Sequence, residues 1–234
     1  MKRKNKKLKI GLALGGGGAR GLAHIGILKV LEENGIEADF IAGTSIGAMI
    51  GAFYSHTKDA KKVENLALFT DWKKVVSLID PSIHQGILNG KKVEAYIEEF
   101  IGKTSFKNLK IPFCAVATDL KTGKPVVLCK GNVVPAVRAS ISLPLVFKPV
   151  KLKGKVLSDG GLSVPIPVDV VKNMGADFVI AVNLDGDYKT TNKDEEFGFT
   201  KIADSSINIL RYHLANSNIK NADFVVTPKV GKFG

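Results

Sequence analysis

Short apolar runs alternate with longer amphipathic segments along most of the chain. The apolar runs predict strands at residues 9–14, 39–42, 111–118, 125–129, 156–158, 178–184 and 224–227. The amphipathic segments predict helices at residues 22–34, 48–55, 59–70, 91–100, 134–140, 168–174 and 199–219. Strands that alternate with helices favour an α/β fold with a mainly parallel sheet covered on both faces.

Composition favours one globular unit. The 234 residues are 45% hydrophobic and 24% charged, which is ordinary for a single packed core. We expect one domain over residues 10–234, because α/β folds of this length are often undivided. No apolar run approaches the roughly 18 residues of a membrane-spanning helix. The two cysteines, Cys114 and Cys129, lie in apolar strand-like runs, and we expect both to be reduced and buried.

Basic residues are concentrated at the N-terminus. The formal net charge is +12, and six basic residues fall within the first nine positions: Lys2, Arg3, Lys4, Lys6, Lys7 and Lys9. We expect residues 1–9 to form a disordered, solvated arm. The alternative is attraction of this arm to an anionic membrane face, worth ~1 kcal/mol per basic residue.

The same end of the chain bears on location and partners. The apolar run at residues 10–14 is shorter than the roughly 7–15 residues of a secretory signal core. We therefore expect a cytoplasmic protein, either free or peripheral at the inner membrane face. Nucleic acid is not an expected partner, because the sequence has neither zinc-finger spacing nor an aromatic RNA-binding motif.

A glycine-rich loop at residues 15–18 follows the first predicted strand and has two interpretations. Gly16, Gly18 and Gly21 match the dinucleotide-binding pattern G-x-G-x-x-G, and Asp39 follows near the spacing of a ribose-binding acid. However, that acid belongs at the end of the second strand, whereas Asp39 precedes it. The second interpretation is an oxyanion hole, because glycines allow main-chain N–H groups to approach a ligand at the start of a helix. The loop alone does not decide between the two.

Residues 43–47 form the pattern G-x-S-x-G between a predicted strand and a predicted helix. In a nucleophile elbow, such a turn lifts the serine hydroxyl clear of the main chain, and glycines relieve the crowding on either side. The alternative is that Ser45 is an ordinary helix N-cap. The glycine loop about 25 residues upstream favours the nucleophile, because acyl transfer needs both a nucleophile and an oxyanion hole.

A serine nucleophile needs a base, and none of the four histidines is well placed for that role. His213 follows every candidate acid but lies in a polar helix, where we expect it to be solvated, and we expect His24 to be structural. Asp159-Gly160-Gly161 is the better candidate, since it sets a carboxylate on a turn after a short strand. The alternative is a simple Asp-Gly turn.

Together these motifs resemble the patatin-like phospholipase family in its small bacterial branch, from about residue 9 to residue 230. The glycine loop with Arg20 and Gly21 resembles the family's G-G-G-x-R/K-G motif, and residues 43–47 resemble its nucleophile elbow. Asp159-Gly160-Gly161 resembles its D-G-G/A motif, and residues 139–144 with Phe147 are similar to a further family block. Residues 117–120 and 122–123 also look like the small bacterial members.

The resemblance implies a three-layer α/β/α fold and a Ser–Asp dyad without a catalytic histidine or a cofactor. Ser45 would be the nucleophile, Asp159 the base, and the amides around Gly16, Gly17 and Gly18 the oxyanion hole. Arg20 would either bind an anionic head group or brace the loop. Further candidates for substrate contact are Ile46, Met49, Pro144 and Phe147. For Met49 and Phe147 the alternative is core packing. Lysines at positions 148, 151, 153 and 155 would either rim the site or form a solvated hairpin.

The resulting expectation is a serine hydrolase of phospholipid or lysophospholipid acyl esters. An acyltransferase with the same dyad and a non-catalytic lipid-binding or regulatory protein are the alternatives, followed by a dinucleotide-binding protein. The sequence contains no metal-ligand cluster and no calcium loop, and it does not indicate an oligomeric state.

Overall fold

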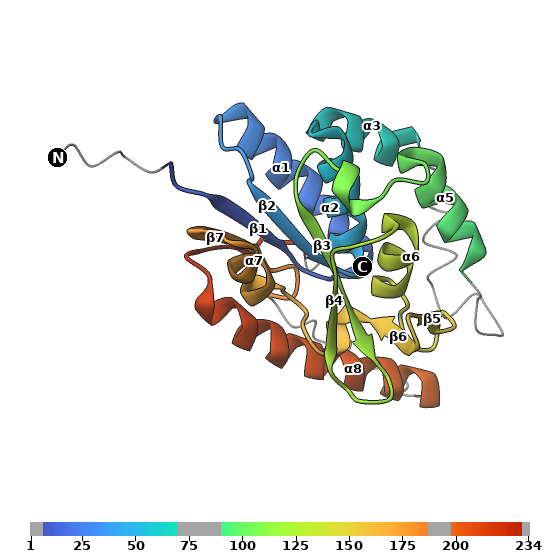
Figure 1. Ribbon diagram of the computed structural model, residues 1–234. Coiled ribbons are helices and arrows are strands. Elements are labelled where there is room, and N and C mark those ends of the chain that lie inside the picture. The colour runs from blue at the N-terminus through green and yellow to red at the C-terminus, as the bar shows by residue number, and fades with distance from the viewer. Residues whose placement is uncertain (1–6, 70–89, 187–197, 231–234) are drawn as a thin grey trace.

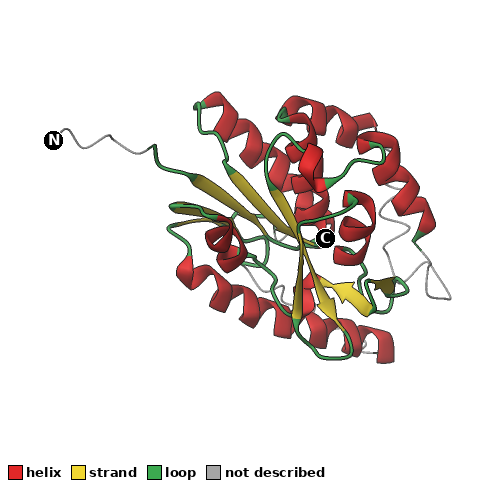
Figure 2. Cartoon of the chain, in the orientation of Figure 1, coloured by secondary structure: helices red, strands yellow, loops and turns green. Residues whose placement is uncertain are grey.

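The computed structural model describes residues 7–69, 90–186 and 198–230 (Figure 1). Within these residues the strands form one eight-stranded sheet. Figure 2 shows the sheet between two layers of helices. The predicted three-layer α/β/α fold is confirmed.

The strands are β1 (Ile10–Leu14), β2 (Phe40–Thr44), β3 (Phe113–Asp119), β4 (Pro125–Leu128), β5 (Val150–Leu152), β6 (Lys155–Asp159), β7 (Phe178–Val182) and β8 (Phe224–Val226). The α-helices are α1 (Ala23–Glu33), α2 (Ile46–Thr57), α3 (Ala60–Phe69), α5 (Lys91–Ile101), α6 (Val133–Ser140), α7 (Val168–Met174) and α8 (Phe199–Asn218). The part of the chain that the structure describes also forms the 3₁₀-helices η1 (Gly18–Leu22), η2 (Phe106–Asn108), η3 (Gly160–Leu162) and η4 (Ile219–Asn221).

The sheet is mixed, with a parallel centre. Its order is β5-β6-β3-β2-β1-β7-β8, and β4 pairs with β3 outside that path. The strands β3, β2, β1, β7 and β8 run parallel, whereas β4, β5 and β6 add antiparallel pairings at the β3 side. The parallel centre agrees with the alternation of strands and helices in the sequence.

Each face of the sheet packs against its own helices (Figure 1). In β1, Leu12 and Leu14 point to the larger core under α1, α2, α3, α5 and α6, while Ala13 points to the smaller core under α7 and α8. Helix α7 lies very close to β1, because a Cβ added at Gly11 would be 2.0 Å from a Val171 side-chain carbon.

The main differences from the predicted elements are local. Helix α2 begins at Ile46, two residues before the predicted start. Strand β5 was not predicted because its three residues are too short a segment to show a strand pattern. Residues 1–6 of the arm predicted at residues 1–9 lie outside the described residues, as does one of the four histidines, His84.

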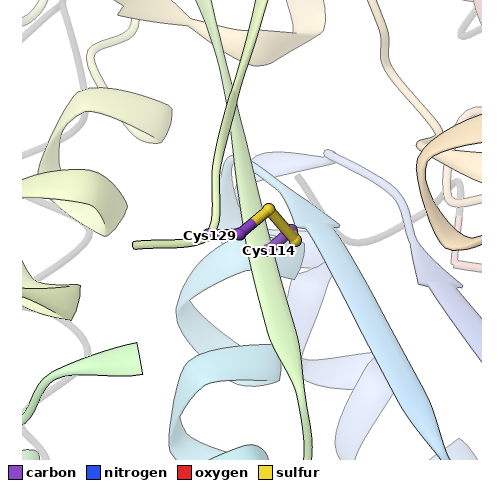
Figure 3. Close-up of a disulfide and its surroundings, with 2 residues drawn as sticks. All are labelled: Cys114 and Cys129. Atoms are coloured by element: carbon purple, nitrogen blue, oxygen red, sulfur yellow. A yellow bond between two sulfur atoms is a disulfide. The ribbon is translucent and has the colours of Figure 1, made fainter. Parts of the chain in front are cut away.

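The prediction that the cysteines are reduced is wrong. Cys114 of β3 and Cys129, directly after β4, form a disulfide (Figure 3). Ala115 pairs with Leu128, so Cys114 and Cys129 are directly opposite in the antiparallel pair, with Cα atoms 4.4 Å apart. This separation is that of a non-hydrogen-bonded pair, in which side chains lie closest.

One edge of β3 is shared by two strands, β2 and then β6. Ile41 N–H of β2 donates to Pro112 O, and Leu120 N–H donates to Val156 O of β6. In contrast, Asp119 N–H donates to Lys124 O on the β4 side. Because successive residues direct their main-chain groups to opposite edges, β2 and β6 occupy the same edge. The last residue of β2, Thr44, and the last residue of β6, Asp159, therefore lie opposite consecutive residues of β3, and the C-terminal ends of the two strands meet.

Candidate active site

Ser45 occupies a strained turn between β2 and α2. Its dihedral angles are φ 56° and ψ −125°, a conformation that costs a non-glycine residue about 1–3 kcal/mol. The two flanking glycines are required by close main-chain contacts. A Cβ at Gly43 would be 2.3 Å from Gly47 O, and a Cβ at Gly47 would be 2.2 Å from Leu14 O. The G-x-S-x-G pattern therefore has the strand–turn–helix context that an elbow needs.

Asp159 lies at the end of β6 and faces this turn. Ser45 Oγ donates a 2.6 Å hydrogen bond to Asp159 Oδ2, across 114 positions of sequence. The contact follows from the shared edge of β3, since Thr44 pairs with Val116 and Asp159 pairs with the next residue, Ala117.

The environment of Asp159 suits a proton acceptor. The residue is 3% exposed, and this burial raises the pKa of its carboxyl group. The hydrogen bonds from Ser45 and from Gly161 N–H (2.7 Å to Oδ1) act in the opposite direction. A raised pKa makes the carboxylate a stronger base than an exposed aspartate.

The two glycines after Asp159 also have a steric reason. A Cβ at Gly160 would be 2.2 Å from Val116 O, and one at Gly161 would be 2.9 Å from Asp159 Oδ1. Side chains at these positions would displace β3 or the carboxylate itself, so the D-G-G sequence is a packing requirement.

The glycine loop lies beside the turn, and its amides differ in their partners. Gly15 N–H donates to Val182 O and Gly16 N–H to Pro165 O. The amides of Gly17 and Gly18 have no acceptor among the described residues. Gly18 has φ +58°, and an added Cβ would have nothing within 4 Å. Two adjacent amide donors, of which that of Gly18 is at an open position, suit the binding of an oxyanion.

The His24 side chain contacts the first residue of the glycine loop. It is fully buried, and its Nε2 lies 2.8 Å from Gly15 O. Burial lowers its pKa to about 4, so the ring is neutral at pH 7 and donates Nε2–H to that carbonyl. The expectation of a structural role agrees with these contacts.

A family model for patatin-like phospholipases matches residues 12–172. The chain belongs to the patatin-like phospholipase family. An uncharacterized NTE family protein of Mycobacterium tuberculosis is 38% identical over 195 residues, 80% of this chain and 52% of that protein. Lysophospholipase nte1 of Aspergillus fumigatus is 35% identical over 181 residues, 75% of this chain and 12% of that protein. The chain thus spans about half the length of the mycobacterial relative and a small part of the fungal one.

Among solved structures, the chain is similar to VipD from Legionella pneumophila. The TM-score is 0.50 at 14% sequence identity, and the match covers 74% of this chain and 49% of VipD. At this identity the likeness concerns the fold alone, and it agrees with the patatin-like architecture described above.

In this patatin-like chain Arg20 braces the glycine loop. Its Nη2 lies 2.6 Å from Asp185 Oδ1, its Nη1 donates to Leu184 O (2.8 Å), and its Nε donates to Gly17 O (3.2 Å). Arg211 of α8 binds both oxygens of Asp185, at 2.9 and 3.0 Å. We call Arg20, Asp185 and Arg211 the arginine–aspartate cluster. It ties the loop to the end of β7 and to α8.

The four other predicted contact residues differ in exposure. Ile46 is buried and packs directly against Gly21. A Cβ added at Gly21 would be 2.1 Å from an Ile46 side-chain carbon. Met49 is 2% exposed and Phe147 4% exposed, the latter beneath the Arg138 guanidinium. Pro144 is half-buried. For all but Pro144 the contacts are those of core packing.

The remaining expectations concern charged residues. Lys151, Lys153 and Lys155 lie on the exposed β5–β6 hairpin, and Lys155 pairs with Asp119 at 3.7 Å. Asp39 lies at the start of β2, the sheet end opposite the glycine loop, where its Oδ2 accepts Ile10 N–H. It is therefore not placed as a ribose-binding acid. His213 is exposed on α8, as expected.

Neither Asp185 nor Arg211 was predicted, because they lie 165 and 191 positions beyond Arg20 without a shared motif. Nor was a role for Ser140, although the block around it was noted. Within the described residues, no group of His, Cys, Asp and Glu is arranged to hold a metal, and no helix is both long and apolar enough to cross a membrane.

Proposed function

We propose that this chain is a serine hydrolase of fatty-acyl esters, acting on phospholipids or lysophospholipids. Ser45 is the nucleophile, Asp159 is the base, and the amides of Gly17 and Gly18 hold the oxyanion. The observation that carries the proposal is the 2.6 Å contact from Ser45 Oγ to Asp159 Oδ2. Family membership and the lysophospholipase among the relatives support the substrate class.

The mechanism follows from these positions. As Ser45 Oγ attacks the acyl carbonyl carbon, its proton passes to Asp159 Oδ2 and the carbonyl electrons move to the oxygen. The negative oxygen is bound by the two free loop amides. The tetrahedral intermediate then expels the alcohol, which takes the proton from Asp159. Asp159 next accepts a proton from water, which attacks the acyl-serine to form a second tetrahedral intermediate. As this intermediate collapses, the bond from Ser45 Oγ to the acyl carbon breaks, Asp159 returns the proton to Ser45 Oγ, and the fatty acid leaves.

Two substitutions test the dyad. Ser45→Ala removes the nucleophile, and Asp159→Asn removes the base while keeping the shape of the side chain. We expect each to abolish release of p-nitrophenol from acyl esters and to leave the folding transition cooperative. A fluorophosphonate should label wild-type Ser45. Wild-type turnover in either variant would refute the assignment.

A product assay separates hydrolysis from acyl transfer. A panel of phospholipids and lysophospholipids is incubated with the protein, with and without added alcohols, and products are measured by mass spectrometry. We expect free fatty acid as the main product. Acylated acceptor as the main product would favour a transferase, and no product without fluorophosphonate labelling would favour a lipid-binding protein.

The basic surface supports a second part of the proposal, peripheral binding to anionic membranes. The exposed hairpin carries Lys151 and Lys153, and the sequence adds the basic positions of the arm. We expect sedimentation with vesicles that contain an anionic phospholipid and weaker sedimentation in high salt. Equal binding to purely zwitterionic vesicles would refute this part.

A further inference from the structure

Ser140, the last residue of α6, contacts the main chain of the turn that carries Ser45. Its Oγ accepts a 2.9 Å hydrogen bond from Ser45 N–H and donates a 2.6 Å hydrogen bond to Val116 O. The side chain is 0% exposed. Both directions of the hydroxyl are thus used, so its orientation is fixed.

This hydroxyl lies in a gap in the sheet. Thr44 is the last β2 residue paired with β3, opposite Val116. At Ser45 the chain turns to positive φ, so its N–H cannot continue the ladder to the Val116 carbonyl. Ser140 Oγ lies between Ser45 N–H and Val116 O and forms a hydrogen bond with each, so neither buried main-chain group is left without a partner.

The same short segment also holds Asp159. Ser142 O accepts Asp159 N–H at 3.0 Å and Ser158 Oγ at 2.7 Å. Ser142 Oγ is fixed in turn, because it accepts from Arg138 Nη1 (2.7 Å) and donates to Arg138 O (2.9 Å). The two members of the Ser–Asp contact are therefore anchored two residues apart on one buried segment.

We propose that Ser140 is a positioning residue: its hydroxyl fixes the main chain of Ser45, and hence Ser45 Oγ, relative to Asp159. The inference rests on the proposed function, because it assigns a role in that site. Ser140 itself does not touch substrate. Its role differs from a general packing role, because the bond reaches the amide of the nucleophile directly.

The test compares Ser140→Ala with Ser140→Thr and with a control. In Ser140→Ala, Ser45 N–H loses its acceptor and the strained turn can shift. A shift of about 1 Å at reacting groups can cost ~10²-fold in rate, so we expect kcat to fall about 10–100-fold with KM within about twofold. Ser140→Thr keeps a hydroxyl and should restore most of kcat.

The control is Thr57→Val at the far end of α2. Its hydroxyl also donates to a main-chain oxygen, Phe53 O at 3.0 Å, but lies away from the dyad. Hydrogen exchange followed by NMR gives a readout that does not depend on activity. In Ser140→Ala the Ser45 amide should exchange at least about tenfold faster, whereas the Ile41 amide, bonded to Pro112 O in the sheet, should not change.

Each outcome is decisive. A fall in kcat together with faster exchange at Ser45 alone supports the proposal. An unchanged kcat, an equal fall in Thr57→Val, or faster exchange at Ile41 as well would overturn it. If the wild type neither hydrolyses esters nor reacts with a fluorophosphonate, the proposed function itself fails. That result is distinct from an active wild type whose Ser140→Ala variant keeps its kcat.

Discussion

Asp185→Asn tests whether the arginine–aspartate cluster holds the glycine loop in place. The Asp185 side chain is 7% exposed, and those of Arg20 and Arg211 are 11% and 15% exposed. Removing one partner of a buried ion pair costs about 3–5 kcal/mol. Asparagine keeps one acceptor oxygen, so we expect the lower end of that range. At about 2–4 °C per kcal/mol for a chain of this size, the midpoint of thermal unfolding should fall by about 6–12 °C.

The same change should slow chemistry at Ser45. Arg20 also donates to Gly17 O, next to the two amides assigned to the oxyanion. If Arg20 turns away from the neutral side chain of the variant, these amides lose their fixed position, and fluorophosphonate labelling of Ser45 should slow by about 10–100-fold.

Asp204→Asn is a matched control, because Asp204 lies on α8 and is exposed, with a hydrogen bond only to Asn208 among the bonds described. Its unfolding free energy should stay within about 0.5 kcal/mol of wild type. Urea unfolding and labelling rates are measured for both variants. If Asp185→Asn matches Asp204→Asn in stability and labels within twofold of wild type, the cluster does not hold the loop.

Three further predictions concern the dyad carboxylate, the disulfide and the elbow glycines. Because burial raises the pKa of Asp159, the rise of kcat/KM with pH should have its midpoint above the usual pKa range of an aspartate. A midpoint near pH 4 would contradict this. The folded chain then binds this proton more tightly than the unfolded chain. The stabilising contribution of Asp159 is therefore present below the unfolded pKa and lost as pH rises through the folded pKa. Asp159→Asn should accordingly unfold at pH 7 no earlier than wild type by calorimetry, and a large loss of stability would argue against this reasoning. Replacing Cys114 and Cys129 with serine removes the disulfide, which closes a loop of 15 positions. The free energy of unfolding measured in urea should fall by about 3 kcal/mol, and an unchanged midpoint would mean that the disulfide does not stabilise the fold. Gly47→Ala brings Cβ to 2.2 Å from a β1 carbonyl oxygen and should destabilise by about 1–3 kcal/mol, while Gly26→Ala on the open face of α1 should stabilise by about 0.5–1 kcal/mol; equal effects of the two would refute the steric argument.

The sequence predicts the elements well wherever local pattern and local structure coincide. Helix α7 has its predicted bounds, because its apolar spacing ends at Gly175, which has φ 108°. The elbow and the D-G-G turn are also predictable, because a Cβ added at any of their glycines would be only 2.2–2.9 Å from a neighbouring atom. These glycines adjoin Ser45 and Asp159 in the sequence. Short motifs of this kind are recognisable in the sequence because the local packing requires a glycine at each of these positions.

What short motifs do not predict are the contacts made between segments far apart in the sequence. The disulfide was not predicted, although the strands predicted at residues 111–118 and 125–129 are joined by a segment centred so that Cys114 and Cys129 fall opposite each other. Applying antiparallel register to that hairpin would have revealed the pair. Asp185 and Arg211 carry no comparable signal, because their meeting with Arg20 depends on where β7 ends and how α8 crosses the sheet edge.

The candidate site depends most directly on the register of two strands on one edge of β3. Thr44 of β2 pairs with Val116, and Asp159 of β6 pairs with Ala117, so the turn and the carboxylate are adjacent only because these partners are consecutive. A shift of β6 by one residue would carry Asp159 to the opposite face of the sheet, and no rotamer could then restore the contact with Ser45. The Ser140 hydroxyl and the Ser142 carbonyl act at this junction, on Ser45 N–H and Asp159 N–H respectively. The separation of Ser45 and Asp159 is thus fixed by hydrogen bonds to their main-chain amides, and the two side chains need only their own rotamers to meet.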